Sequence, residues 1–141
     1  MSLPENFNLF VYGSLRSGFK SPAYEYISRY FQFVSDGKVK GYLYDLGEYP
    51  AALPTNDPAF IVGELYQARD SAQFDYVIAQ LDDYEGVTPE AGESPLYNRL
   101  LTEVHTPQGN VPAWVYWYNG SITDRPIVES GDVMEYLRGK G

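Results

Sequence analysis

The segment Phe7-Asn8-Leu9-Phe10-Val11-Tyr12-Gly13-Ser14-Leu15-Arg16-Ser17-Gly18 changes from apolar to polar at its midpoint. Its apolar and aromatic half is typical of a short buried strand over residues 8–12. Gly13 then lets the chain turn and lets a ligand approach the main chain closely. The N–H groups of such a turn can converge on an anion, and the Ser14 hydroxyl can donate and accept. The segment predicts a buried strand followed by a turn, which either binds a ligand or simply redirects the chain.

Composition limits the kind of protein that is built around this strand. A chain of 141 residues fits one domain, so we predict a single domain over residues 1–141. The content of 14 Tyr and 7 Phe favours strands over a helical bundle. A net charge of −9 disfavours nucleic-acid binding and contact with an anionic membrane surface. The absence of cysteine excludes disulfides and thiol chemistry. No oligomeric state follows from these numbers.

Cofactors and membrane insertion also find little support in the sequence. One His and no Cys leave no nitrogen or sulfur cluster for a metal, and the acidic residues do not follow a calcium-loop spacing. No glycine-rich dinucleotide or phosphate motif is present. No apolar run is long enough to span a membrane, and the N-terminus lacks the basic and then apolar pattern of a signal peptide. We therefore expect a cytoplasmic protein that needs no metal and no organic cofactor.

Apolar periodicity and turn residues predict the other elements. Strand material is expected around a turn in residues 34–39 and 41–46, then in 60–66, and in a hairpin of 98–104 and 112–118 joined at 107–110. Residues 47–54 carry two prolines and are expected to form an irregular loop. In residues 112–118 both faces are apolar, which indicates a central strand. Such a set of strands predicts an α+β fold whose mixed sheet can curl into a small barrel.

Helices are expected at three places. Ser21-Pro22 resembles an N-cap followed by proline, and the helix after it should turn Tyr24, Ile27, Tyr30 and Phe31 inward. The clearest helix covers 71–84, with Asp70 or Ser71 as its cap, Gly86 fitting its end, and one apolar stripe. That stripe consists of Phe74, Val77, Ile78, Leu81 and Tyr84. A short capped helix is expected over 130–137.

Three carboxylates, Asp82, Asp83 and Glu85, crowd the last turn of that clearest helix. The C-terminal end of a helix carries partial negative charge, so each anion there costs about 0.3–1 kcal/mol. The unfavourable dipole and the mutual repulsion both raise the pKa of a carboxyl group, which suits a general base. A solvated acidic corner with ordinary pKa values is the alternative.

Four motifs resemble landmarks of the gamma-glutamylcyclotransferase-like (AIG2-like) family, in register along nearly the whole chain. Val11-Tyr12-Gly13-Ser14-Leu15-Arg16 is similar to the N-terminal motif of the family, and Leu81-Asp82-Asp83-Tyr84-Glu85-Gly86 is similar to its acidic motif. Tyr97-Asn98-Arg99 and Ser130-Gly131-Asp132 resemble later landmarks. The resemblance implies a small mixed β-barrel with helices packed outside.

The resemblance also implies a reaction and a site. A γ-glutamyl compound would be cyclised to 5-oxoproline by attack of its own α-amine on its γ-carbonyl, with release of an amine or amino acid. Glu85 occupies the acidic motif position and would be the general base, while Asp82 would cap or orient the turn. Tyr12, Gly13, Ser14, Leu15 and Tyr97 would bind the substrate, with no metal and no cofactor.

Several alternatives stay open from the residues themselves. Tyr97 would either reach the pocket with its hydroxyl or pack as an aromatic ring, and Arg99 would pair with a carboxylate or meet the substrate. His105 receives no role. The same barrel would also serve a protein that binds a small metabolite or a partner without catalysis. The loop 47–54 is a candidate pocket wall, and the acidic loop Glu90-Ala91-Gly92-Glu93 would suit either solvent or a cationic leaving group.

Overall fold

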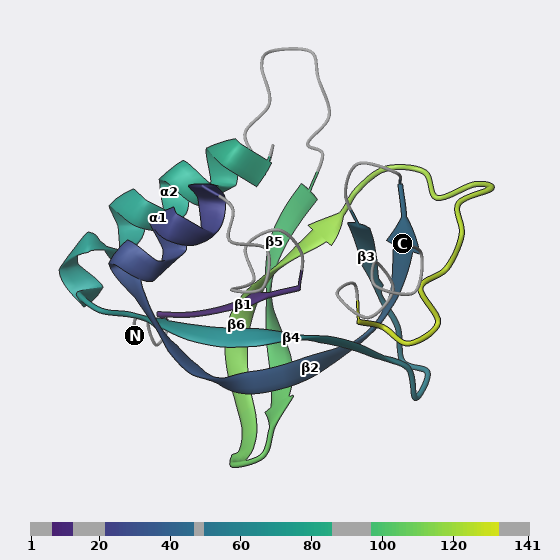
Figure 1. The fold of residues 1–141 in the computed structure, drawn as a ribbon, viewed down its shortest axis with the longest axis horizontal. Coiled ribbons are helices and arrows are strands. Elements are labelled where there is room, and N and C mark those ends of the chain that lie inside the picture. The colour runs from purple at the N-terminus through teal and green to yellow at the C-terminus, as the bar shows by residue number, and fades with distance from the viewer. Residues whose placement is uncertain (1–6, 13–21, 47–49, 86–96, 133–141) are drawn as a thin grey trace, which may run out of the picture.

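The computed structural model describes residues 7–12, 22–46, 50–85 and 97–132, although the side chains of residues 22–24, 50, 84 and 85 fall outside that description. Within these ranges the chain forms β1 (Asn8–Val11), α1 (Pro22–Tyr30), β2 (Phe31–Asp45), β3 (Pro50–Pro54) and β4 (Phe60–Ala68). The 3₁₀ turn η2 (Ser71–Gln73), α2 (Phe74–Glu85), β5 (Tyr97–Thr106) and β6 (Gly109–Tyr118) complete the described elements (Figure 1).

The strands form one sheet that closes on itself. Their order is β3-β2-β4-β1-β6-β5, and a further pairing of Lys38 in β2 with His105 in β5 closes a barrel of β2, β4, β1, β6 and β5. β1 runs antiparallel to β4 and parallel to β6, so the sheet is mixed. β3 pairs with β2 beside the barrel. The predicted mixed barrel with outer helices is therefore confirmed.

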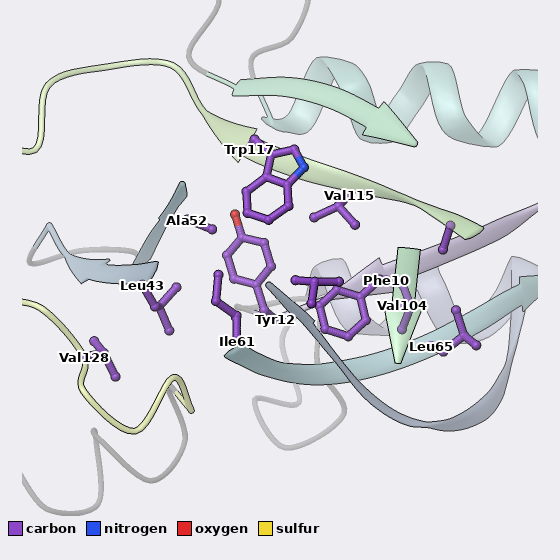
Figure 2. Packing of buried hydrophobic residues seen from close by; sticks show 12 residues of the cluster. Phe10, Tyr12, Leu43, Ala52, Ile61, Leu65, Val104, Val115, Trp117 and Val128 are labelled. Carbon is purple, nitrogen blue, oxygen red and sulfur yellow. The ribbon is translucent and has the colours of Figure 1, made fainter. Parts of the chain in front are cut away.

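The alternation of side chains along the strands builds two apolar clusters. Phe10 and Tyr12 point into the barrel, whereas Leu9 and Val11 point outward under the helices. The same split occurs in β6, which is central as its two apolar faces predicted: Val115 lies inside and Tyr116 outside. Figure 2 shows the inner cluster, in which the Phe10 and Tyr12 rings occupy the barrel interior.

Both helices lie on the same side of the barrel (Figure 1), and each contributes to the outer cluster, with Ile27 from α1 and Val77 from α2. α1 begins at Pro22, as the Ser-Pro pair predicted, and buries Ile27 completely. The Asp70 carboxylate accepts a 2.9 Å hydrogen bond from the Ala72 N–H and so caps the turn that precedes α2. The described members of the predicted α2 stripe, Phe74, Val77, Ile78 and Leu81, are all buried.

One expected turn is wrong: β2 runs from Phe31 to Asp45, so residues 34–39 and 41–45 belong to one strand. Gly37 lies within this strand and pairs with Gly63 of β4. A Cβ at Gly37 would come within 2.9 Å of Val104 Cγ1, so this glycine makes room for the barrel interior and does not mark a turn. Phe31, expected on the first helix, is the first residue of β2 and is buried as predicted.

The expected irregular loop over 47–54 is also wrong for its second half, because Pro50–Pro54 form β3. β3 pairs with β2 and stands at the edge of the sheet, with its prolines as first and last residues. At those places a missing N–H interrupts no ladder, which is why proline is tolerated. Ser130 Oγ accepts the Asp132 N–H at 3.2 Å, but most of the short helix expected after it lies outside the described residues.

Candidate functional site

The candidate site begins where β1 ends. Tyr12 is buried, and its ring stands inside the barrel with the hydroxyl directed toward β6, the strand that carries Trp117 (Figure 2). The hydroxyl donates a 2.5 Å hydrogen bond to the main-chain carbonyl of Tyr116. The side chain of Tyr12 is thereby fixed, directly after Val11, the last paired residue of β1. The next candidate residues, Gly13, Ser14 and Leu15, lie outside the described residues.

The last turn of α2 meets β5 and β6 through Asp82. The Arg99 guanidinium donates from Nε to Asp82 Oδ1 at 2.7 Å and from Nη2 to Oδ2 at 3.0 Å. The Tyr116 hydroxyl donates to Oδ1 at 2.8 Å. Asp82 is 8% exposed, and the Arg99 guanidinium lies 4.5 Å from the centre of the Trp114 ring. We call the side chains of Asp82, Arg99 and Tyr116 the Asp82 network.

The Asp82 network decides between the two roles left open for Arg99, which pairs with a carboxylate. It also changes the electrostatics expected at the end of α2. The charge of Asp82 is compensated by a bidentate guanidinium, so Asp82 repels its neighbours less than three uncompensated carboxylates would. Asp83 is exposed to solvent. Of the three carboxylates, Glu85 is the last residue of α2, and its side chain lies outside the described residues.

Tyr116 links the two halves of the candidate site. Its main-chain carbonyl accepts the Tyr12 hydroxyl at the end of β1, and its own hydroxyl donates to Asp82, one helical turn before Glu85. β1 and β6 run parallel with Leu9 opposite Trp114, which brings the end of β1 to the level of Tyr116. The end of β1 and the last turn of α2 are therefore linked through one residue of β6, although they are far apart in sequence.

Tyr97 opens β5 and is 5% exposed. Its ring packs edge-on against Tyr118, with ring centres 5.5 Å apart, within the outer cluster under the helices. The structure thus gives Tyr97 a packing role, and a contact with substrate stays a prediction.

A buried carboxylate that belongs to none of the sequence motifs lies on β4. Glu64 is 7% exposed, pairs with Val11 of β1, and accepts a 2.9 Å hydrogen bond from the Tyr66 hydroxyl. A single acidic residue inside the apolar strand 60–66 was the available signal. Its pairing with Val11 puts the Glu64 main chain beside the last residue of β1.

Other features lie away from these residues. A hollow of about 520 Å³ opens between β2, β4 and residues 127–131, and no candidate residue lines it. The ring of His105 packs edge-on against the ring of Phe60, with ring centres 5.3 Å apart. His105 lies near the hairpin end of β5, opposite to the end that carries Tyr97.

In the described part of the chain, no three His, Asp or Glu side chains gather as metal ligands. Among those same residues no helix is long and apolar enough to cross a membrane.

Known proteins resemble this chain in sequence and in fold. The model of the family "Gamma-glutamyl cyclotransferase, AIG2-like" matches residues 9–135. The Escherichia coli protein YtfP, described as a gamma-glutamylcyclotransferase family protein, is 33% identical over 90% of this chain and 96% of its own length. The chain belongs to the gamma-glutamyl cyclotransferase, AIG2-like family.

Two further relatives extend this assignment. The mouse AIG2-like protein has a crystal structure that matches with a TM-score of 0.65 and 26% identity, covering 89% of this chain and 87% of the mouse chain. A Niallia circulans protein, gamma-L-glutamyl-butirosin B gamma-glutamyl cyclotransferase, is 27% identical over 79% of this chain and 67% of its own length. Family and relatives together support a gamma-glutamylcyclotransferase-like activity on a small γ-glutamyl substrate.

Proposed function

We propose that this protein cyclises a γ-glutamyl compound to 5-oxoproline, with Glu85 as the general base and without metal or organic cofactor. The observation that carries the proposal is the double contact of Tyr116. Through it, Tyr12 at the entrance to the Gly13 turn and Asp82 in the Glu85 turn are joined by hydrogen bonds of 2.5 Å and 2.8 Å. The reaction requires an anion anchor and a base that act on one substrate. Tyr12 directly precedes the residues that we assign to the anchor, and Asp82 lies three residues before the one that we assign as the base.

The reaction asks little covalent chemistry of the protein. The substrate's α-amine nitrogen attacks its own γ-carbonyl carbon, a C–N bond closes the five-membered lactam, and the C–N bond to the leaving amine breaks. Because nucleophile and electrophile belong to one molecule, folding the substrate supplies much of the rate. Glu85 takes one proton from the α-ammonium group, which frees the amine to attack, and passes it to the leaving nitrogen. The ring nitrogen loses a second proton as the lactam forms, and the departing amine takes it up and leaves as an ammonium ion. The attacking group belongs to the substrate, so no water is consumed.

The substrate's negative charges are assigned to the turn after β1. The N–H groups of Gly13, Ser14 and Leu15 hold the glutamyl end and the oxyanion that develops on the γ-carbonyl oxygen. Tyr12 fixes the position from which this turn starts, since its ring is buried and its hydroxyl is bonded. Tyr97 forms part of the pocket wall.

A panel of γ-glutamyl amino acids and γ-glutamyl amines, assayed for released 5-oxoproline, tests the proposal. We expect turnover of at least one compound, and the preferred leaving group identifies the substrate subclass. Binding of these compounds without any turnover would instead favour a metabolite-binding protein on the same barrel.

Substitutions in the Gly13 turn separate main-chain from side-chain anchoring. Ser14→Ala removes one neutral hydrogen bond, worth about 0.5–1.5 kcal/mol, so KM should rise about two- to twelvefold with kcat retained. Gly13→Val should lower kcat/KM further, because a side chain there blocks close approach of the substrate to the main chain. The measurement is steady-state release of 5-oxoproline. A fully active Gly13→Val enzyme would exclude this turn as the anchor.

Treatment with a chelator tests the absence of a metal. We expect the rate of 5-oxoproline release to be unchanged after dialysis against EDTA and after addition of Mg²⁺, Mn²⁺ or Zn²⁺, because Glu85 and main-chain N–H groups perform every step proposed. Loss of activity that a divalent ion restores would show that a metal takes part.

A further inference from the structure

Three hydrogen bonds converge on Asp82 close to the C-terminal end of α2. Both oxygens of the carboxylate are used: Oδ1 accepts from Arg99 Nε and Tyr116, and Oδ2 accepts from Arg99 Nη2. The donors come from two adjacent strands, because Arg99 and Tyr116 are paired residues of β5 and β6. These hydrogen bonds connect the last turn of α2 to both β5 and β6. They restrict the direction of the helix axis and the rotation of the helix about that axis.

Stability alone does not explain this arrangement. A carboxylate near a helix C-terminus is unfavourable, and a buried ion pair repays its desolvation only when its geometry is good. The helix is already held on the barrel by its apolar stripe from Phe74 to Leu81. Apolar contacts are non-directional, however, and they leave the last turn free to rotate or shift slightly. Hydrogen bonds to a planar guanidinium remove that freedom.

The Asp82 network also connects the last turn of α2 to the end of β1. Tyr116 donates to Asp82 with its hydroxyl and accepts the Tyr12 hydroxyl with its carbonyl, so a single residue contacts both sides of the candidate site. The Arg99 guanidinium rests on the Trp114 ring at 4.5 Å, which limits its own movement. Glu85 follows Asp82 by one helical turn, the spacing at which two helical residues are neighbours on the same face.

We propose that Asp82, Arg99 and Tyr116 are positioning residues, which set the last turn of α2 against the end of β1 so that Glu85 reaches the substrate. This inference rests on the proposed function and adds to it a set of residues that do not touch the substrate themselves. Because a misplacement of about 1 Å can cost about a hundredfold in rate, loss of the network should reduce kcat. KM should change little, since the substrate is anchored on the Gly13 turn.

The variants are chosen to loosen the network with minimal loss of volume or charge. Tyr116→Phe removes one hydroxyl, and Arg99→Lys keeps the positive charge but loses the fork that binds both carboxylate oxygens. Tyr42→Phe is the matched control, because the Tyr42 hydroxyl donates to Asp57 at 2.7 Å outside the network. Val104→Ala serves as a stability control, because Val104 is fully buried inside the barrel.

Two measurements are made on each full-length variant. Steady-state assays should show kcat lowered about ten- to a hundredfold in Tyr116→Phe and Arg99→Lys, with KM within about twofold. Amide hydrogen exchange should become faster at residues 82–85 of α2 and stay unchanged at 76–79. Neither change is expected in Tyr42→Phe. Val104→Ala should lower the melting temperature without selective exchange in the last turn and with kcat retained.

Unchanged exchange at 82–85, or unchanged kcat, in both network variants would overturn the proposal. A fall of kcat in Val104→Ala as large as in Tyr116→Phe would do the same, because it would assign the loss to general destabilisation. If the wild-type protein releases no 5-oxoproline from any compound of the panel, the proposed function fails. The exchange measurement then still decides whether the network fixes the last turn of α2.

Discussion

Glu85→Gln should lower kcat for 5-oxoproline release by about two to four orders of magnitude, the usual contribution of a positioned acid–base group. The substitution preserves the size of the side chain and removes its ability to take a proton from the α-ammonium group. KM should change little, because the Gly13 turn and not Glu85 anchors the glutamyl end. Release of 5-oxoproline by purified wild type and variant measures the effect, and calorimetry with Glu85→Gln measures substrate binding.

Asp83→Asn is the matched control for Glu85→Gln. Asp83 is exposed and belongs to the same end of α2, so this change removes the same charge from the same turn without removing the proposed base. We expect Asp83→Asn to keep kcat within about twofold of wild type. Equal losses in the two variants would mean that local charge, not proton transfer, determines the rate. An unaltered rate in Glu85→Gln would move the base role to another group.

The sequence predicted those parts of the fold that depend on the spacing of apolar residues along a single helix or strand. The apolar stripe of α2 and the two-faced pattern of β6 repeat every few residues, so the sequence specifies which side of each element is buried. The Pro22 start of α1 and the Asp70 cap are equally local signals. The number and aromatic content of the strands predicted that the sheet can curl into a barrel. They did not predict that Lys38 and His105 form the pair that closes it.

The errors arise where a local signal has two physical meanings. The turn expected within residues 34–46 is absent. Gly37 in this segment instead leaves room for the Val104 side chain of another strand. Proline excludes a strand interior but not an edge, and β3 is at the edge. Neither distinction can be made until the neighbouring strands are known.

The motifs that suggest the candidate site are visible in the sequence, but the contacts between them are not. The sequence indicated Tyr12 and the acidic end of α2 separately, and it left the partner of Arg99 open. Which carboxylate Arg99 binds depends on the packing of α2 over β5, a long-range feature. The double contact of Tyr116 likewise depends on the parallel pairing of β1 with β6, which no motif encodes.

Gly63→Ala should be among the most destabilising single substitutions in the barrel. A Cβ at Gly63 would come within 2.2 Å of the Val11 carbonyl oxygen and 2.6 Å of Phe10 Cζ. The ring can move a little, but the carbonyl is main chain and can retreat only if β1 separates from β4. We expect a loss of about 3 kcal/mol or more in the free energy of unfolding, at the upper end for an overpacked core, as measured by urea denaturation.

Gly37→Ala is the natural comparison, because Gly37 is the residue that pairs with Gly63. Its Cβ would approach the Val104 side chain at 2.9 Å and the nearest main-chain atom, the His105 oxygen, at 3.3 Å. It should therefore cost less than Gly63→Ala. Adding Phe10→Leu to Gly63→Ala should restore only part of the stability, because it relieves the ring contact and leaves the Val11 carbonyl contact. Full recovery would contradict the main-chain explanation and assign the loss to the Phe10 ring alone.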